Sequence, residues 1–122
     1  MICILRPAFG AIAAALLATA AFAHHAWNEV DTTTTFTLTG TVKSLKWENP
    51  HSSLVLTVAS DGATVDWTVQ MSGLARMESH GIGRGDVAVG KVLTIVASPA
   101  RDEAQVVRAN HIRSDGKDHV LY

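Results

Sequence analysis

Cysteine is almost absent from this 122-residue chain. The single cysteine, Cys3, lies ahead of an apolar amino-terminal segment that we expect to be removed on export. The processed chain would therefore form no disulfide and offer no thiolate to a metal or a substrate. The sequence also has no G-x-S-x-G motif and no glycine-rich phosphate loop after a strand. We therefore expect a binding protein and no enzyme.

An excess of positive charge is missing as well. The chain carries 10 Lys and Arg against 11 Asp and Glu, a formal net charge of −1. Loss of Arg6 with the amino-terminal segment would make the balance slightly more acidic. This balance argues against nucleic acid and anionic lipid surfaces as partners. It leaves a small ligand, a metal ion or another protein as the partner classes to consider.

Residues 1–23 have the three regions of an export signal. A short start with one positive charge is followed by an apolar run over residues 8–20 and an A-x-A site over residues 21–23. The run is short for a membrane span, so we expect cleavage after Ala23 and no stable span afterwards. The expected product is a periplasmic protein with one small domain over residues 24–122.

The remainder of the chain is predicted to be mainly β. The five expected strands cover residues 36–47, 52–59, 64–70, 92–97 and 105–113. Within the first strand the apolar residues change parity between Val42 and Leu45, which indicates a β-bulge. Residues 60–63 and 114–117 each contain Asp-Gly, which is typical of tight hairpins. Residues 120–121 are expected to pair back as a short last strand.

The single helix that the sequence predicts covers residues 73–80, between the third and fourth strands. Ser72 is the expected N-cap. Gly81 fits the left-handed position after the helix, and Ile82 would then contact Met77. Three strands, a short helix and two further strands match the five-stranded OB-type barrel. An open sandwich or roll with a similar number of strands is the alternative.

Several short motifs resemble those of a known family. They are the His24–Trp27 start of the processed chain, Gly40-Thr41-Val42, the W-x-N-P-H sequence at Trp47–His51, and Trp67. In these residues the chain is similar to an uncharacterised family of exported bacterial proteins that carries a domain-of-unknown-function label. The resemblance covers the whole processed chain. It implies export and a small β-barrel, and it implies no particular activity.

Three histidines suggest a metal site. After cleavage His24 would carry a free α-amine beside its imidazole, and these two nitrogens can chelate one metal. A third nitrogen from His51, which follows a proline corner, would complete a set that suits copper. His25 is an alternative ligand. The other interpretation is structural: the two first histidines form a flexible start, and His51 bonds a nearby backbone carbonyl.

Three further histidines carry weaker signals. His80 is expected near the carboxyl end of the helix, where the helix dipole favours a protonated ring. His111 and His119 have no partner at a ligand-like spacing, and we expect both on the surface.

The three tryptophans admit two interpretations. Trp47 and Trp27 would form a ligand-binding face on the barrel, as aromatic residues do in OB folds. Alternatively, Trp47 and Trp67 belong to the core, which the shared parity of Trp67 with its apolar neighbours favours. Trp27 would also pin the arm of residues 24–31 to the domain by burying its ring.

Overall fold

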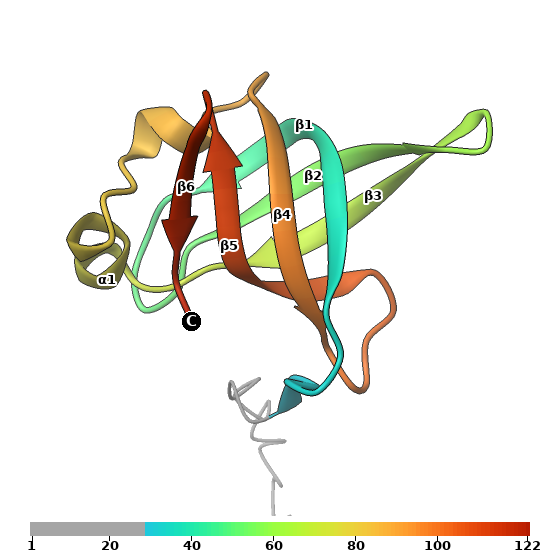
Figure 1. The fold of residues 1–122 in the computed structure, drawn as a ribbon, viewed down its shortest axis with the longest axis horizontal. Coiled ribbons are helices and arrows are strands. Elements are labelled where there is room, and N and C mark those ends of the chain that lie inside the picture. Colours follow the sequence, from blue (N-terminus) through green and yellow to red (C-terminus); the bar gives the residue numbers. More distant parts are fainter. Residues whose placement is uncertain (1–28) are drawn as a thin grey trace, which may run out of the picture.

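Strand β1, Phe36–Lys46, is the element around which the sheet closes (Figure 1). The computed structural model describes residues 29–122. The first half of β1 pairs antiparallel with β4, Val92–Pro99, and the second half pairs antiparallel with β2, Ser53–Ser60. Gly40 lies close to the point where β1 changes its pairing partner from β4 to β2. A Cβ at this position would lie 2.3 Å from the Thr57 carbonyl oxygen. A glycine is therefore required for this approach of two backbones.

The predicted bulge in the first strand is confirmed. The register between β1 and β2 shifts between Val42 and Ser44, so that Lys43 is the extra residue. The extra residue moves the following apolar side chains onto the other parity and bends the strand. Val42 is buried before the bulge, and Leu45 packs against the core after it. Because β1 bends, it can pair with β4 in its first half and with β2 in its second half.

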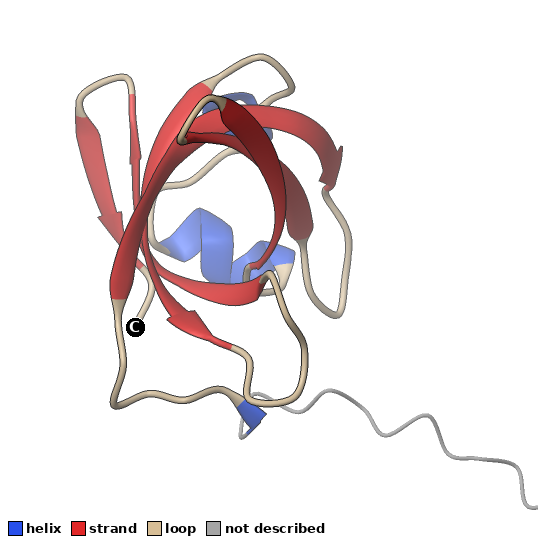
Figure 2. Cartoon of the chain, turned by 90° about the vertical axis from the view of Figure 1, so that its right-hand side faces the viewer, coloured by secondary structure: helices blue, strands red, loops and turns tan. Residues whose placement is uncertain are grey.

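The sheet closes into a barrel of five strands with a sixth strand added. Strand β3, Ala63–Gln70, pairs with β2, and strand β5, Val106–Ser114, pairs with β4. A short parallel pairing of β3 with β5 closes the ring, which Figure 2 shows end-on. The sixth strand, β6, covers Lys117–Val120 and pairs antiparallel with β5. The predicted OB-like barrel is confirmed.

Helix α1, Leu74–Ser79, closes one end of the barrel (Figures 1 and 2). Its carboxyl end has the predicted geometry: Gly81 has φ +78°, and the Ile82 N–H donates to the Met77 carbonyl at 2.9 Å. The predicted N-cap is wrong. The N-cap residue is Gly73, and the Ser72 hydroxyl bonds elsewhere. A short 3₁₀ helix, η2, follows at Arg84–Val87.

The barrel interior is filled by apolar side chains from strands β1 to β5 and from α1. Leu56, Leu93 and Met77 are fully buried. Trp47 and Trp67 are partly buried and pack against this core, and the Trp67 ring lies 5.5 Å from the Phe36 ring, centroid to centroid. Burial of this apolar surface is the main stabilising contribution to the fold.

Candidate functional site

The corner between β1 and β2, residues 47–52, contains the W-x-N-P-H sequence. The Asn49–Pro50 peptide is cis. The Asn49 side-chain oxygen accepts a hydrogen bond of 2.9 Å from the Leu74 N–H, the first in α1. Asn49 thus satisfies a helix N-terminal donor that the N-cap Gly73 has no side chain to satisfy.

Two further contacts hold this corner. A Cβ on Gly73 would lie 2.7 Å from the Pro50 carbonyl oxygen, so the corner and the start of α1 are in direct backbone contact. The buried Ser52 donates its N–H to the Ser72 carbonyl at 3.0 Å and accepts from the Met71 N–H at 2.8 Å. The corner is therefore fixed to the helix and to the segment before it.

His51 lies between Pro50 and Ser52 in this fixed corner, and it is exposed. The other residues of the predicted metal site, His24 and His25, lie outside the described residues, as does Trp27 of the predicted ligand face. Within residues 29–122, no three His, Cys, Asp or Glu side chains are grouped closely enough to hold a metal ion. The structure thus places one of the predicted ligands, on a rigid and accessible support.

Next to the corner, two arginines pack over the ring of Tyr122. The Arg76 and Arg108 guanidinium carbons are 4.4 Å and 4.3 Å from the centroid of the Tyr122 ring. Both distances are within the range of cation–π attraction. The Tyr122 hydroxyl bonds the Ser72 hydroxyl at 2.6 Å, and Arg76 donates to the Leu121 carbonyl at 2.7 Å.

Arg108 is itself held by a buried polar pair. The Asn110 side-chain oxygen accepts from the Arg108 Nε and from one terminal nitrogen, at 3.3 Å and 3.1 Å, and the Asn110 amide donates to the Ser98 hydroxyl at 2.8 Å. Asn110 is the extra residue of a second bulge, where the register between β4 and β5 shifts. Arg108 is 9% exposed, so its guanidinium plane is positioned by buried partners.

These groups border a hollow of about 360 Å³ on the outside of the barrel. We call it the arginine hollow. Its lining comes from the segment before β1, from β4, from β5 and from the carboxyl-terminal residue: Thr32, Thr35, Val96, Ser98, Arg108, Asn110, His111 and Tyr122.

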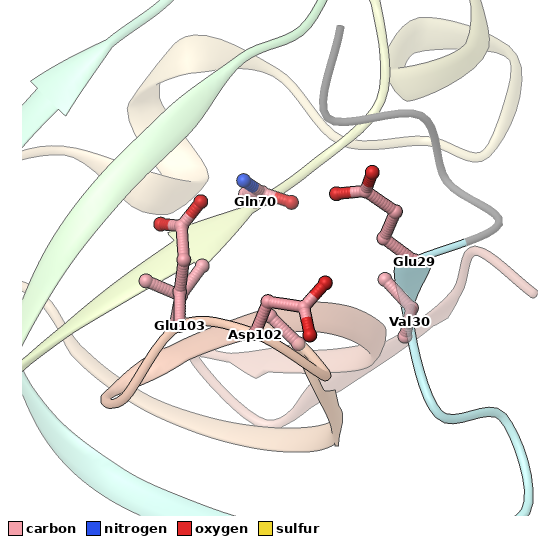
Figure 3. A pocket seen from close by; sticks show the side chains of 7 residues that line it. Glu29, Val30, Gln70, Asp102 and Glu103 are labelled. Atoms are coloured by element: carbon pink, nitrogen blue, oxygen red, sulfur yellow. The ribbon is translucent and has the colours of Figure 1, made fainter. Parts of the chain in front are cut away.

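A smaller acidic hollow lies where the described chain begins. Figure 3 shows the side chains of Glu29, Gln70, Asp102 and Glu103 around it. The Glu29 carbonyl accepts the Arg101 N–H at 2.9 Å, so the start of the described chain is fixed to the β4–β5 loop. Gln70, which lines this hollow, pairs in register with Arg108, which lines the arginine hollow.

Neighbouring hydrogen-bond donors lower the pKa of two carboxylates. Hydrogen bonds from Lys43 (2.7 Å) and from the Thr57 hydroxyl (2.8 Å) lower the pKa of Asp66 below its ordinary value of 3.8. Hydrogen bonds from the Thr33 hydroxyl and backbone lower the pKa of Asp31 in the turn before β1. Both side chains stay ionised in neutral solution and act as acceptors, which is a structural role.

The remaining histidines differ in position. His80 is the C-cap residue of α1, as expected from the sequence, and His111 is exposed on β5. The prediction that His119 lies on the surface is wrong. His119 is 9% exposed, its Nδ1 lies 3.2 Å from the His80 carbonyl oxygen, and its Nε2 has no hydrogen-bond partner among the described residues. Side chains alternate between the two faces of β6, and His119 lies on the face directed towards the carboxyl end of α1.

The Arg–Tyr–Arg stack and the polar set around Arg108 did not emerge from the sequence. The three aromatic and basic residues, Arg76, Arg108 and Tyr122, are far apart in the chain and belong to no motif. The available signal was an interruption of the apolar alternation at Asn110, since Val107 and Ala109 share one parity and Ile112 has the other. Such an interruption indicates either a bulge or a buried polar network.

Comparison with protein families gives a match over most of the chain. A family described as a family of unknown function (DUF6152) matches residues 12–108. No curated protein matches the chain. Within the described residues, no helix is both long enough and apolar enough to cross a membrane. Since the match spans most of the sequence, the chain belongs to the DUF6152 family of unknown function.

Proposed function

We propose that this protein is exported, loses residues 1–23, and acts in the periplasm as a non-enzymatic copper-binding protein. The α-amine and ring of His24 supply two nitrogens, and the ring of His51 supplies the third. His25 is an alternative ligand at the same site. Three nitrogen donors from one terminal residue and one distant histidine suit copper by ligand type and number.

One observation carries the proposal: the described chain begins beside β3, the strand that pairs with β2 just after His51. Glu29 and Gln70 line the same hollow, and Gln70 pairs with Ser53, two residues after His51. His24 is five residues before Glu29, and five residues of extended chain span about 17 Å. We propose that this length of chain brings His24 to the corner.

The rigidity of the corner supports the same role. Its backbone is bonded to α1 through Asn49 and to residues 71–72 through Ser52. A ligand on such a support loses little conformational freedom when it binds a metal. In this proposal His51 supplies a preorganised donor, and His24 at the processed amino terminus supplies the chelate.

Copper titration followed by electron spin resonance tests the proposal. The protein beginning at His24 is compared with a protein that has one added alanine before His24. The addition converts the α-amine into an amide, and we expect the affinity for copper to fall roughly a hundredfold because a linked donor is lost. Equal affinities and identical spectra for the two proteins would refute the terminal chelate.

A second candidate function is the binding of a small ligand or a protein partner on the barrel face, without a metal. It is favoured by Trp47, which is only partly buried and directly precedes the corner. This function predicts that Trp47→Ala weakens partner capture in the presence of a chelator. Loss of all capture on addition of a chelator would exclude it.

A further inference from the structure

His119 on β6 is an ionisable side chain that the fold buries with one nitrogen unpaired. The residue is 9% exposed, and its Nδ1 lies 3.2 Å from the His80 carbonyl oxygen at the carboxyl end of α1. Because a carbonyl oxygen only accepts, Nδ1 carries the proton of the neutral ring. Nε2 then has a bare lone pair, and this buried atom has no hydrogen-bond partner within residues 29–122.

The ring of His119 lies in a closely packed place. The residue opposite it on β5 is Ile112, which is fully buried, and Leu121 on the same face of β6 is 1% exposed. A Cβ added to Gly81 would lie 3.7 Å from Nδ1, which is van der Waals contact. A second proton on the ring would therefore create a buried N–H donor that has no acceptor. Such a group is costly, and more so when it carries a charge.

The charged groups of α1 do not supply that acceptor. Arg76 donates to the Leu121 carbonyl at 2.7 Å, whereas the side chains of Glu78 and His80 are exposed. The negative end of the helix dipole favours a positive ring. However, His119 already contacts that end through its Nδ1–H, so the dipole leaves Nε2 without a partner.

The charged groups of the neighbouring elements are also directed elsewhere. Arg113 and Asp118 form an ion pair of 3.6 Å on the exposed face of the β5–β6 hairpin, opposite to the face of His119. Lys117 is exposed at the start of β6. In η2, the Asp86 carboxylate accepts the N–H of the N-cap residue at 2.8 Å. The ring of His119 is therefore accommodated as a neutral group.

We propose that His119 makes the contact between β6 and the end of α1 sensitive to acid. The neutral ring joins the two elements through its bond to the His80 carbonyl. A proton on Nε2 needs water as its acceptor, and water reaches this atom only when β6 and α1 separate. The open form binds one more proton than the closed form, so a fall in pH favours opening. Opening exposes the end of α1, where Met77 and Ile82 are otherwise buried. This behaviour does not depend on the proposed copper site.

Amide hydrogen exchange of the copper-free protein at about pH 7 and about pH 5 tests the proposal. The Ile82 N–H, bonded within the end of α1 at 2.9 Å, and the Leu121 N–H, bonded to β5 at 2.7 Å, report on the two sides of the contact. After correction for the intrinsic exchange rate, their protection should fall roughly tenfold or more, because one histidine proton is taken up in this range. The Thr68 N–H, bonded to the β4–β5 loop at 2.9 Å, should keep its protection.

Two variants assign the effect to one ring. His119→Asn keeps an N–H donor for the His80 carbonyl but takes up no proton in this range, so the protection of Ile82 should be the same at both pH values. His111→Asn, at an exposed histidine on β5, is the matched control and should behave like the wild type. A fall of equal size in His119→Asn and the wild type, or no fall in the wild type, would overturn the proposal.

The ring nitrogen chemical shifts of wild-type His119 provide a second test that needs no variant, since His119→Asn also removes buried ring atoms. At neutral pH we expect the proton on Nδ1 and a bare Nε2. On acidification, Nε2 should become protonated together with the loss of protection at Ile82. A proton on Nε2 while Ile82 remains protected would contradict the proposal.

Discussion

Two connections between neighbouring strands show how differently this chain makes its turns. The β2–β3 connection is a tight hairpin in which Asp61 and Gly62 have φ values of +48° and +80°. It projects away from the barrel in Figure 1, and its residues are exposed. The β1–β2 corner instead bonds to α1 through Asn49 and to residues 71–72 through Ser52.

The hairpin depends on the conformational preferences of two residues, and the corner depends on distant parts of the chain. Asp-Gly between two strands favours a hairpin of the first kind through local backbone preferences. The corner forms only when the barrel is closed and α1 is in place. A side chain that must meet a ligand in one geometry is better placed at the second kind of turn, which is where His51 lies.

The largest predicted effect comes from Gly73 at the corner. Gly73→Ala should lower the free energy of unfolding by about 3 kcal/mol, because the new Cβ would lie 2.7 Å from the Pro50 carbonyl oxygen. Urea denaturation measures the change. Gly85→Ala is the control, since a Cβ there meets nothing within 4 Å. Equal stability of the two variants would show that the corner is not tightly docked on α1.

Gly62 at the hairpin should matter less and for another reason. Gly62→Ala finds no atom within 4 Å, but it places an alanine at φ +80°. The expected loss is about 1.5 kcal/mol, from backbone strain alone. Copper affinity should stay unchanged, whereas it should fall for any variant that loosens the corner. A change in copper affinity for Gly62→Ala would contradict the separation of the two turns.

Asn49 tests the link between the corner and the helix. Asn49→Ala removes the acceptor for the Leu74 N–H and should cost about 1 kcal/mol, the usual value for a lost helix cap. Asn49→Asp keeps an acceptor oxygen and should recover most of the stability. Thermal unfolding of the three proteins measures both effects. If Asn49→Asp were no better than Asn49→Ala, the capping role would be wrong.

The smallest predicted effect is on the pH dependence of the free energy of unfolding. It arises from Asp66 on β3, near the hairpin. Because its pKa is lowered in the folded state, ionised Asp66 stabilises the fold above the ordinary value of 3.8, and this contribution disappears as the pH falls through the folded pKa. The difference in stability between wild type and Asp66→Asn should therefore shrink on acidification. A difference that grows towards low pH would contradict the role assigned to Lys43 and Thr57.

Features that depend on neighbouring residues were predictable from the sequence. The bulge after Val42, the Asp-Gly hairpins and the helix end at Gly81 were all expected, because short-range patterns determine them. Together with the order of the elements, these features were sufficient to predict the barrel.

Features that join distant residues were not predictable. Asn49 caps a helix that begins 25 residues later, and Ser72, the expected cap, instead bonds Tyr122. His119 was placed on the surface because nothing nearby in sequence shows that α1 covers it. The stack of Arg76, Tyr122 and Arg108 was missed for the same reason, since three separate elements meet there.

The central claim is that the corner presents His51 as a copper ligand to the processed amino terminus. The most direct measurement is the copper affinity of protein beginning at His24, compared between His51→Ala and His111→Ala, both at exposed histidines. We predict that His51→Ala weakens binding roughly a hundredfold while His111→Ala leaves it unchanged. Equal affinities for the two variants would contradict the account.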